Sequence, residues 1–187
     1  MKLRQLLAVT LAVTVFSAAA QTPAPRVVLE TTQGNIVVEL AQQAAPKTVD
    51  NFLSYVKSGH YDGTVFHRVI SGFMIQGGGF TADMKEKPTR GTIPLESRNG
   101  LKNVRGTLAM ARRADPDSAS AQFFINVVDN ANLDYPKPDG NGYAVFGKVV
   151  EGMDVVDKIR AAPTDNRGSH QNVPVTPITI KTARIVK

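Results

Sequence analysis

Apolar residues occur in short runs, or alternate with polar ones, along most of the chain, and this pattern predicts many short β-strands. Two such runs, residues 26–32 and 35–40, flank Gln33-Gly34 and predict a hairpin. Further strands are predicted at residues 65–70, 73–76, 108–111, 123–127, 143–150 and 178–186. The stretches between them are rich in polar residues, glycine and proline, and we interpret four of them as loops: residues 81–103, 112–121, 130–141 and 163–171. Glycines 77–79 are expected to end the strand at 73–76.

Two segments carry helical spacing instead. The first follows Pro46, a residue tolerated in a first helical turn, and ends near Gly59. Its apolar residues recur at i, i+3, i+4 and i+7 and form one stripe: Val49, Phe52, Leu53 and Val56. A shorter helix is predicted at 152–160, with Val155, Val156 and Ile159 facing inward. Short strands with two well-separated helices are typical of an all-β sandwich or barrel with helical caps, and 187 residues suit a single domain.

The first twenty residues predict a targeting segment rather than part of the fold. Lys2 and Arg4 form a positive start, residues 6–16 are largely apolar, and the alanines at 18–20 fit a cleavage site before Gln21. The apolar run is short for a membrane span, and a retained amphipathic anchor is the alternative. Residues 21–26, with two prolines, are expected to form a flexible lead-in to a domain at 27–187.

The amino-acid composition excludes several kinds of functional site. The chain has no cysteine, which excludes thiol catalysis, disulfides and cysteine-ligated zinc. The formal charge of +6 falls to +4 if Lys2 and Arg4 are removed. The basic residues are dispersed, and the pair Arg112-Arg113 is followed at once by Asp115 and Asp117. We therefore expect a solvated basic surface rather than a nucleic-acid site.

Arg68 stands in an apolar strand, so it either faces solvent or points into a cleft where its charge is used. His67, beside it, is expected to face away from Arg68 and to have a buried structural role. His60 and His170 lie at predicted loops, and no metal-ligand spacing surrounds them, so we predict no metal. The glycines at 77–79 lack the flanking pattern of a phosphate loop and indicate a close backbone approach or a bulge.

Four motifs, in order, carry a family resemblance: FHRVI and FMIQGG within residues 66–78, GTLAMA at 106–111, SAQFFI at 120–125 and VFGKV at 145–149. They resemble the cyclophilins, the peptidyl-prolyl cis-trans isomerases, and the similarity extends from about Val27 to the C-terminus. The bacterial, exported type is the most similar. The resemblance implies a mainly β fold, a closed eight-stranded antiparallel barrel with a helix over each end, and an isomerase that needs no cofactor.

The resemblance also implies the site. The peptide bond resists rotation through amide resonance, and a donor placed near the proline nitrogen stabilises the twisted amide more than the planar one. Arg68 matches that donor, and Gln76 matches a residue that accepts from the guanidinium or contacts the substrate. An apolar pocket for the proline ring is implied at Phe73, Met74, Phe124 and Leu133, with Asn103, Ala111 and Gln122 lining the groove. Phe73 and Met74 are adjacent, so on a regular strand they would point to opposite faces.

Two positions depart from the family pattern. Asn132 stands where many cyclophilins carry a tryptophan, and the chain has no tryptophan, so weak cyclosporin binding is expected. Tyr143 occupies the position of a pocket histidine and can still line a wall and donate one hydrogen bond.

Together these observations predict an exported prolyl isomerase, periplasmic or, alternatively, secreted. It would act as a monomer on unfolded or newly exported polypeptides, with no membrane insertion after cleavage. The alternative is a proline-peptide binding module or chaperone with little turnover.

Overall fold

The computed structural model describes residues 23–186. The predicted targeting segment and its cleavage site therefore lie outside the described residues. Pro23–Pro25 have no regular structure, and Arg26 already belongs to the first strand.

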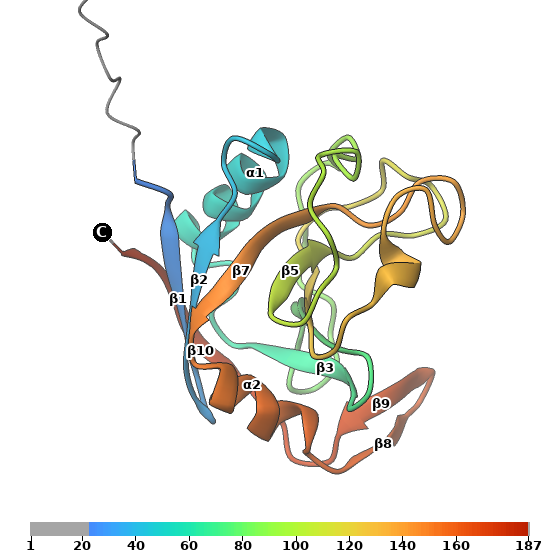
Figure 1. The fold of residues 1–187 in the computed structure, drawn as a ribbon. Coiled ribbons are helices and arrows are strands. Elements are labelled where there is room, and N and C mark those ends of the chain that lie inside the picture. The colour runs from blue at the N-terminus through green and yellow to red at the C-terminus, as the bar shows by residue number, and fades with distance from the viewer. Residues whose placement is uncertain (1–22, 187) are drawn as a thin grey trace, which may run out of the picture.

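Eight strands form one antiparallel sheet in the order β10-β1-β2-β7-β5-β6-β4-β3. Figure 1 shows the sheet curling from β1 and β2 through β7 and β5. Their bounds are β1 Arg26–Thr31, β2 Gly34–Leu40, β3 Thr64–Ile70, β4 Met74–Thr81, β5 Thr107–Met110, β6 Phe123–Asn126, β7 Val145–Glu151 and β10 Ile180–Val186. The predicted hairpin is β1 and β2, which pair from Arg26 opposite Glu39 to Thr31 opposite Gly34. The predicted strands are thus confirmed in type and position.

The sheet is curled but open, so the expected closed barrel is wrong. The two edge strands, β10 and β3, form no continuous ladder within the described part of the chain; they meet at a single bridge between Val65 and Thr179. Backbone N–H groups of Phe66 and Gly63 donate to Ile178 and Ile180 beside that bridge. A barrel needs pairing along its full closing edge, and here the pairing is limited to this bridge and the two hydrogen bonds beside it.

The two predicted helices are α1 (Pro46–Lys57) and α2 (Met153–Arg160), at opposite ends of the curled sheet (Figure 1). Val49, Phe52 and Val56 of α1 are buried as the stripe predicts, while Leu53 is half-buried. They join the main core, where Phe52 packs edge-on against Phe123 with ring centroids 5.6 Å apart. The helices thus cover the apolar interior that an open sheet leaves at its ends.

Two smaller expectations about secondary structure are also wrong. Strand β4 continues through the glycines at 77–79 instead of ending there. Gly78 has φ +84°, and a Cβ there would lie 2.8 Å from the Tyr61 ring, so only glycine fits. The predicted loop at 163–171 instead contains most of a two-stranded sheet, β8 (Thr164–Arg167) with β9 (His170–Pro174). No helix among the described residues is long and apolar enough to cross a membrane.

Candidate active site

Strand alternation divides the apolar residues between two clusters. Phe123 and Ile125 of β6 point into the main core, whereas Phe124 between them belongs to a second, smaller cluster. Met74, Ala109, Leu133 and Val145 are the other buried members of that second cluster. A cavity of about 140 Å³ opens beside it, lined by Arg68, Phe73, Met74, Gln76, Ala111, Arg112, Phe124, Leu133 and Tyr143. A larger hollow of about 400 Å³, lined by polar loop residues such as Glu96 and Asp117, holds none of these side chains.

Three of the predicted site residues lie in one row across three neighbouring strands. Arg68 of β3 is opposite Gln76 of β4, and Gln76 is opposite Phe124 of β6. A bulge makes this possible: β3 loses register between Phe66 and Arg68, so His67 is an extra residue without a partner. Phe66 therefore faces the main core while Arg68 faces the cavity, although residues two apart on a regular strand share a face.

Arg68 is half-buried at the cavity, and no other described residue forms a hydrogen bond or ion pair with its guanidinium. An arginine stays charged at all physiological pH values and presents several N–H donors in a rigid fork. A half-buried guanidinium with its donors unused in the free protein can donate to a bound ligand.

Gln76 is held by a neighbour other than the one expected. Its Nε2 donates to Gln122 Oε1 at 3.0 Å, and no hydrogen bond joins it to Arg68 among the described residues. Gln122 packs over Gly79, where a Cβ would lie 2.6 Å from the glutamine side chain. Gln122 thus orients Gln76 from behind and does not itself line the cavity.

The apolar wall comes from four of the predicted residues. Phe73 lies in the turn before β4, where its backbone N–H donates to the Ile70 carbonyl. Strand alternation therefore does not apply to Phe73, and it lines the cavity together with Met74. Phe124 and Leu133 complete this wall and are 4% and 6% exposed. Leu133 lies in the short 3₁₀ helix η1 (Ala131–Leu133), and Ala111 follows β5 at the cavity edge.

Asn103 does not reach the cavity. It is 1% exposed, and its Nδ2 donates to Asp134 Oδ1 at 3.1 Å and to the Tyr143 carbonyl at 3.4 Å. Its own carbonyl accepts from the Asn130 N–H at 2.7 Å. The structure therefore gives Asn103 a place behind the site, and its predicted substrate contact stays a prediction.

Arg112 is not among the site residues that the sequence predicts. The sequence pattern places it in a surface loop with Asp115 and Asp117 as its neighbouring charges, but its side chain is 2% exposed and pairs with Asp139. It also lines the cavity, with Cζ 4.6 Å from the centroid of the Tyr143 ring. The only signal in the sequence is the place of Arg112 directly after the apolar strand predicted at 108–111; nothing in the spacing indicates Asp139.

The histidines lie away from the cavity. His60 Nε2 is 3.1 Å from the Gly78 carbonyl, and burial lowers the pKa of this histidine. His67 is 5% exposed, which fits the expected burial. Its Nδ1 is a buried polar atom that has no hydrogen-bond partner among the described residues, whereas most such atoms have one. Within residues 23–186 no cluster of three or more His, Cys, Asp or Glu could hold a metal ion.

Known proteins are similar to this chain in both sequence and fold. The family described as "Cyclophilin type peptidyl-prolyl cis-trans isomerase/CLD" matches residues 26–185. Peptidyl-prolyl cis-trans isomerase A of Dickeya dadantii is 56% identical over 95% of this chain and 93% of its own length. Peptidyl-prolyl cis-trans isomerase B of Escherichia coli is 53% identical over 85% of this chain and 98% of its own length. A crystal structure of a cyclophilin-type isomerase from Cryptosporidium parvum, 28% identical, covers 88% of this chain and 98% of its own with a TM-score of 0.73.

The chain therefore belongs to the cyclophilin-type peptidyl-prolyl cis-trans isomerases. The curled antiparallel sheet with two helices is the fold of that family. The protein is an enzyme, a peptidyl-prolyl cis-trans isomerase, in agreement with relatives of that activity at 53% to 59% identity over most of the chain.

Proposed function

We propose that the enzyme isomerises X-Pro bonds by stabilising the twisted amide with Arg68, while the proline ring packs against the apolar wall of the cavity. The observation that carries this proposal is the row of Arg68, Gln76 and Phe124 on adjacent strands, in which a free guanidinium faces an apolar surface across one strand. A relative from Cryptosporidium parvum, 29% identical, was crystallised in the presence of the dipeptide Ala-Pro, which supports a proline-containing ligand for this protein.

The proposed chemistry needs no bond breaking. The cis and trans X-Pro states differ by about 0.5–1 kcal/mol, so the enzyme only has to lower a barrier of about 18–20 kcal/mol. As the C–N bond twists, the nitrogen recovers its lone pair and becomes an acceptor. An N–H of Arg68 that donates to it binds the transition state more tightly than either planar ground state. Gln76, held by Gln122, would orient the substrate backbone beside it.

Steady-state isomerisation of a short Xaa-Pro peptide tests this mechanism. Arg68→Ala is expected to lower kcat roughly tenfold or more, as the loss of one hydrogen bond from a charged donor implies. Arg68→Lys keeps the charge without the fork and should recover part of the rate. An alanine variant that keeps the wild-type kcat would contradict the proposed role of Arg68.

We further propose that the substrates are unfolded or newly exported polypeptides and that the protein acts as a monomer in the periplasm. The support is the sequence of residues 1–20, with its positive start, apolar run and alanine cleavage pattern. The test is cell fractionation with N-terminal sequencing, which should give Gln21 in the periplasmic fraction. A start at Met1 in the cytoplasmic fraction would overturn the export proposal.

The second candidate, a proline-peptide binding module or chaperone with little turnover, could use the same apolar wall. It predicts that Arg68→Ala weakens peptide binding as much as it slows isomerisation. The family's activity and the free guanidinium of Arg68 favour the enzyme.

A further inference from the structure

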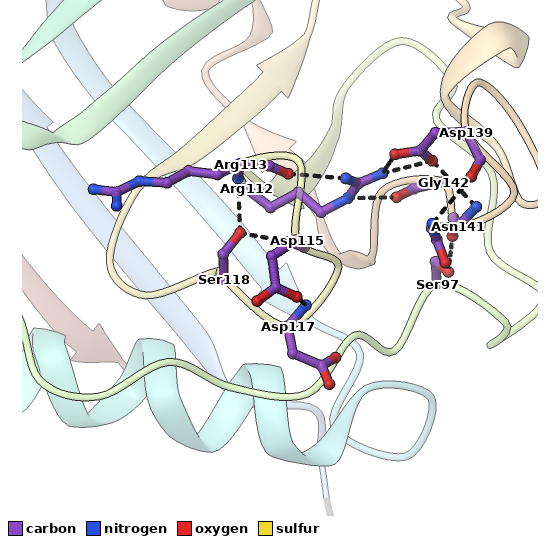
Figure 2. Close-up of polar contacts among 9 residues, drawn as sticks. All are labelled: Ser97, Arg112, Arg113, Asp115, Asp117, Ser118, Asp139, Asn141 and Gly142. Atoms are coloured by element: carbon purple, nitrogen blue, oxygen red, sulfur yellow. Dashed lines mark hydrogen bonds and ion pairs between the residues drawn. The ribbon is translucent and has the colours of Figure 1, made fainter.

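The side chain of Arg112 is buried, and almost all of its donors are used within the protein (Figure 2). Its Nη2 donates to both carboxylate oxygens of Asp139, at 2.8 and 2.7 Å. Its Nε donates to the Gly142 carbonyl and its Nη1 to the Arg113 carbonyl, each at 3.0 Å. A buried guanidinium cannot escape its charge by losing a proton, so it requires such a set of partners.

Asp139 and Gly142 belong to the loop 134–142, which joins two residues of the cavity wall. Leu133 immediately precedes the loop and Tyr143 follows it, and the Tyr143 N–H donates to the Leu133 carbonyl at 2.9 Å. Inside the loop the Asn141 N–H donates to Asp139 Oδ1 at 3.2 Å, and Ser97 Oγ donates to the Asn141 carbonyl (Figure 2). A shift of Asp139 would therefore displace the loop whose two ends carry the cavity residues Leu133 and Tyr143.

Arg112 also contacts the cavity directly. Its guanidinium lies over the Tyr143 ring, with Cζ 4.6 Å from the centroid. That ring meets Phe124 edge-on, with centroids 5.8 Å apart and planes at 77°. The Tyr143 ring thus lies between the guanidinium of Arg112 and the ring of Phe124.

The cavity is lined by two arginines that differ in how their hydrogen-bond donors and charge are used. Arg68 has its donors unused, whereas the charge of Arg112 is balanced by Asp139. Without that carboxylate, Arg112 would present an uncompensated charge beside an apolar wall. A proline ring would then lose affinity both from the altered shape and from the polar surface.

We propose that Arg112, clamped by Asp139, is a positioning residue of this isomerase that shapes the proline-binding wall through Tyr143 and the loop 134–142. The inference rests on the proposed function, because it assumes that the proline ring occupies this cavity. Since the clamp acts on the wall and not on the twisting amide, it should affect the binding of ground state and transition state alike. The expected signature is a raised KM with an unchanged kcat.

The test is steady-state kinetics of Asp139→Asn and Arg112→Met on an Xaa-Pro peptide, at a temperature where circular dichroism shows each variant folded. Both variants should raise KM roughly five- to tenfold and leave kcat within about twofold. Arg112→Lys should recover part of the loss, since it keeps the charge but not the fork or the flat contact with Tyr143. Asp139 does not line the cavity, so an effect of Asp139→Asn on KM reports positioning.

Asp157→Asn is the matched control. Asp157 also receives a two-bond ion pair from an arginine, Arg105, at 3.0 and 2.8 Å, but neither residue lines the cavity. This variant should keep the wild-type KM. The proposal is overturned if Asp139→Asn has the KM of wild type or of Asp157→Asn, or if the clamp variants lower kcat without raising KM.

Phe124→Ala separates this inference from the proposed function. If Phe124→Ala raises KM and the clamp variants do not, the cavity binds proline and the clamp alone is refuted. If Phe124→Ala leaves both KM and kcat unchanged, the cavity is not the proline site, and the proposed function fails together with the clamp.

Discussion

The buried His67 makes a quantitative prediction about acid stability. Burial, followed by the charge of nearby His170, lowers the pKa of His67 from 6.5 to about 4. The folded protein therefore binds fewer protons than the unfolded chain between about pH 6.5 and about pH 4, and stability falls as the pH falls through this window. At 1.36 kcal/mol per pKa unit, the lost free energy of unfolding reaches about 3 kcal/mol.

Carboxylates with lowered pKa values, such as Asp139 beside Arg112, also cost stability in acid. Their contribution is lost mainly below the ordinary carboxyl range near 3.8, so the upper part of the window reports the histidines. His60, whose pKa burial also lowers, contributes in the same direction. Comparison with a variant is needed to isolate His67.

The assay is urea unfolding of wild type and His67→Phe across this pH range. The variant has no titrating group at the site, so the wild type should lose about 3 kcal/mol more than the variant from the top to the bottom of the window. His170→Gln is the control and should keep most of the effect, because burial is the larger cause. Nuclear magnetic resonance titration of His67 in the wild type checks the pKa without any substitution. A difference between wild type and variant that is flat with pH, or a His67 that titrates near 6.5, would refute the reasoning.

Three further predictions each concern a single position: Gly79, Glu96 and Asn132. Gly79→Ala places a Cβ 2.6 Å from the Gln122 side chain and should displace this glutamine. We expect kcat/KM to fall about tenfold, with a small fall in Tm. Unchanged kinetics would show that Gln122 has no part in the site. Glu96 accepts from the Thr48 N–H and Oγ1 at 2.8 and 2.7 Å and caps α1 from a distant loop. Urea unfolding of Glu96→Ala should show a loss of about 1–2 kcal/mol with kcat intact, and no change in the midpoint would contradict the capping role. Asn132 is exposed in η1 where many cyclophilins carry tryptophan, so cyclosporin should inhibit weakly and Asn132→Trp should strengthen inhibition; nanomolar inhibition of the wild type would refute this.

Much of the fold could be predicted from periodicity alone, because β-strands with one buried face and amphipathic helices leave a clear pattern. The stripe of α1 and the hairpin around Gln33-Gly34 are examples. The strand β8 could not be predicted, since all residues of Thr164–Arg167 are exposed and polar. Closure of the sheet was predicted wrongly because it depends on how many residues of β3 and β10 pair with each other, which no local pattern encodes.

Most residues that line the cavity are among those predicted from the sequence, but their geometry could not be predicted. Regular alternation would place Phe66 and Arg68 on one face, and only the bulge at His67 separates them. Phe73 escapes alternation because it lies in a turn. The pairing of Arg112 with Asp139 joins residues 27 positions apart, and no sequence pattern distinguishes Asp139 from the nearer Asp115 and Asp117.

Arg68 is proposed to act on the twisting bond and not on peptide binding. The most direct measurement is the cis–trans exchange rate of a peptide while bound to saturating enzyme, obtained by magnetisation-exchange spectroscopy, together with the dissociation constant. For Arg68→Ala we expect the bound exchange rate to fall roughly 10- to 100-fold, with the dissociation constant within about threefold of wild type. A variant that binds the peptide far more weakly but exchanges the bound peptide at the wild-type rate would contradict this role of Arg68.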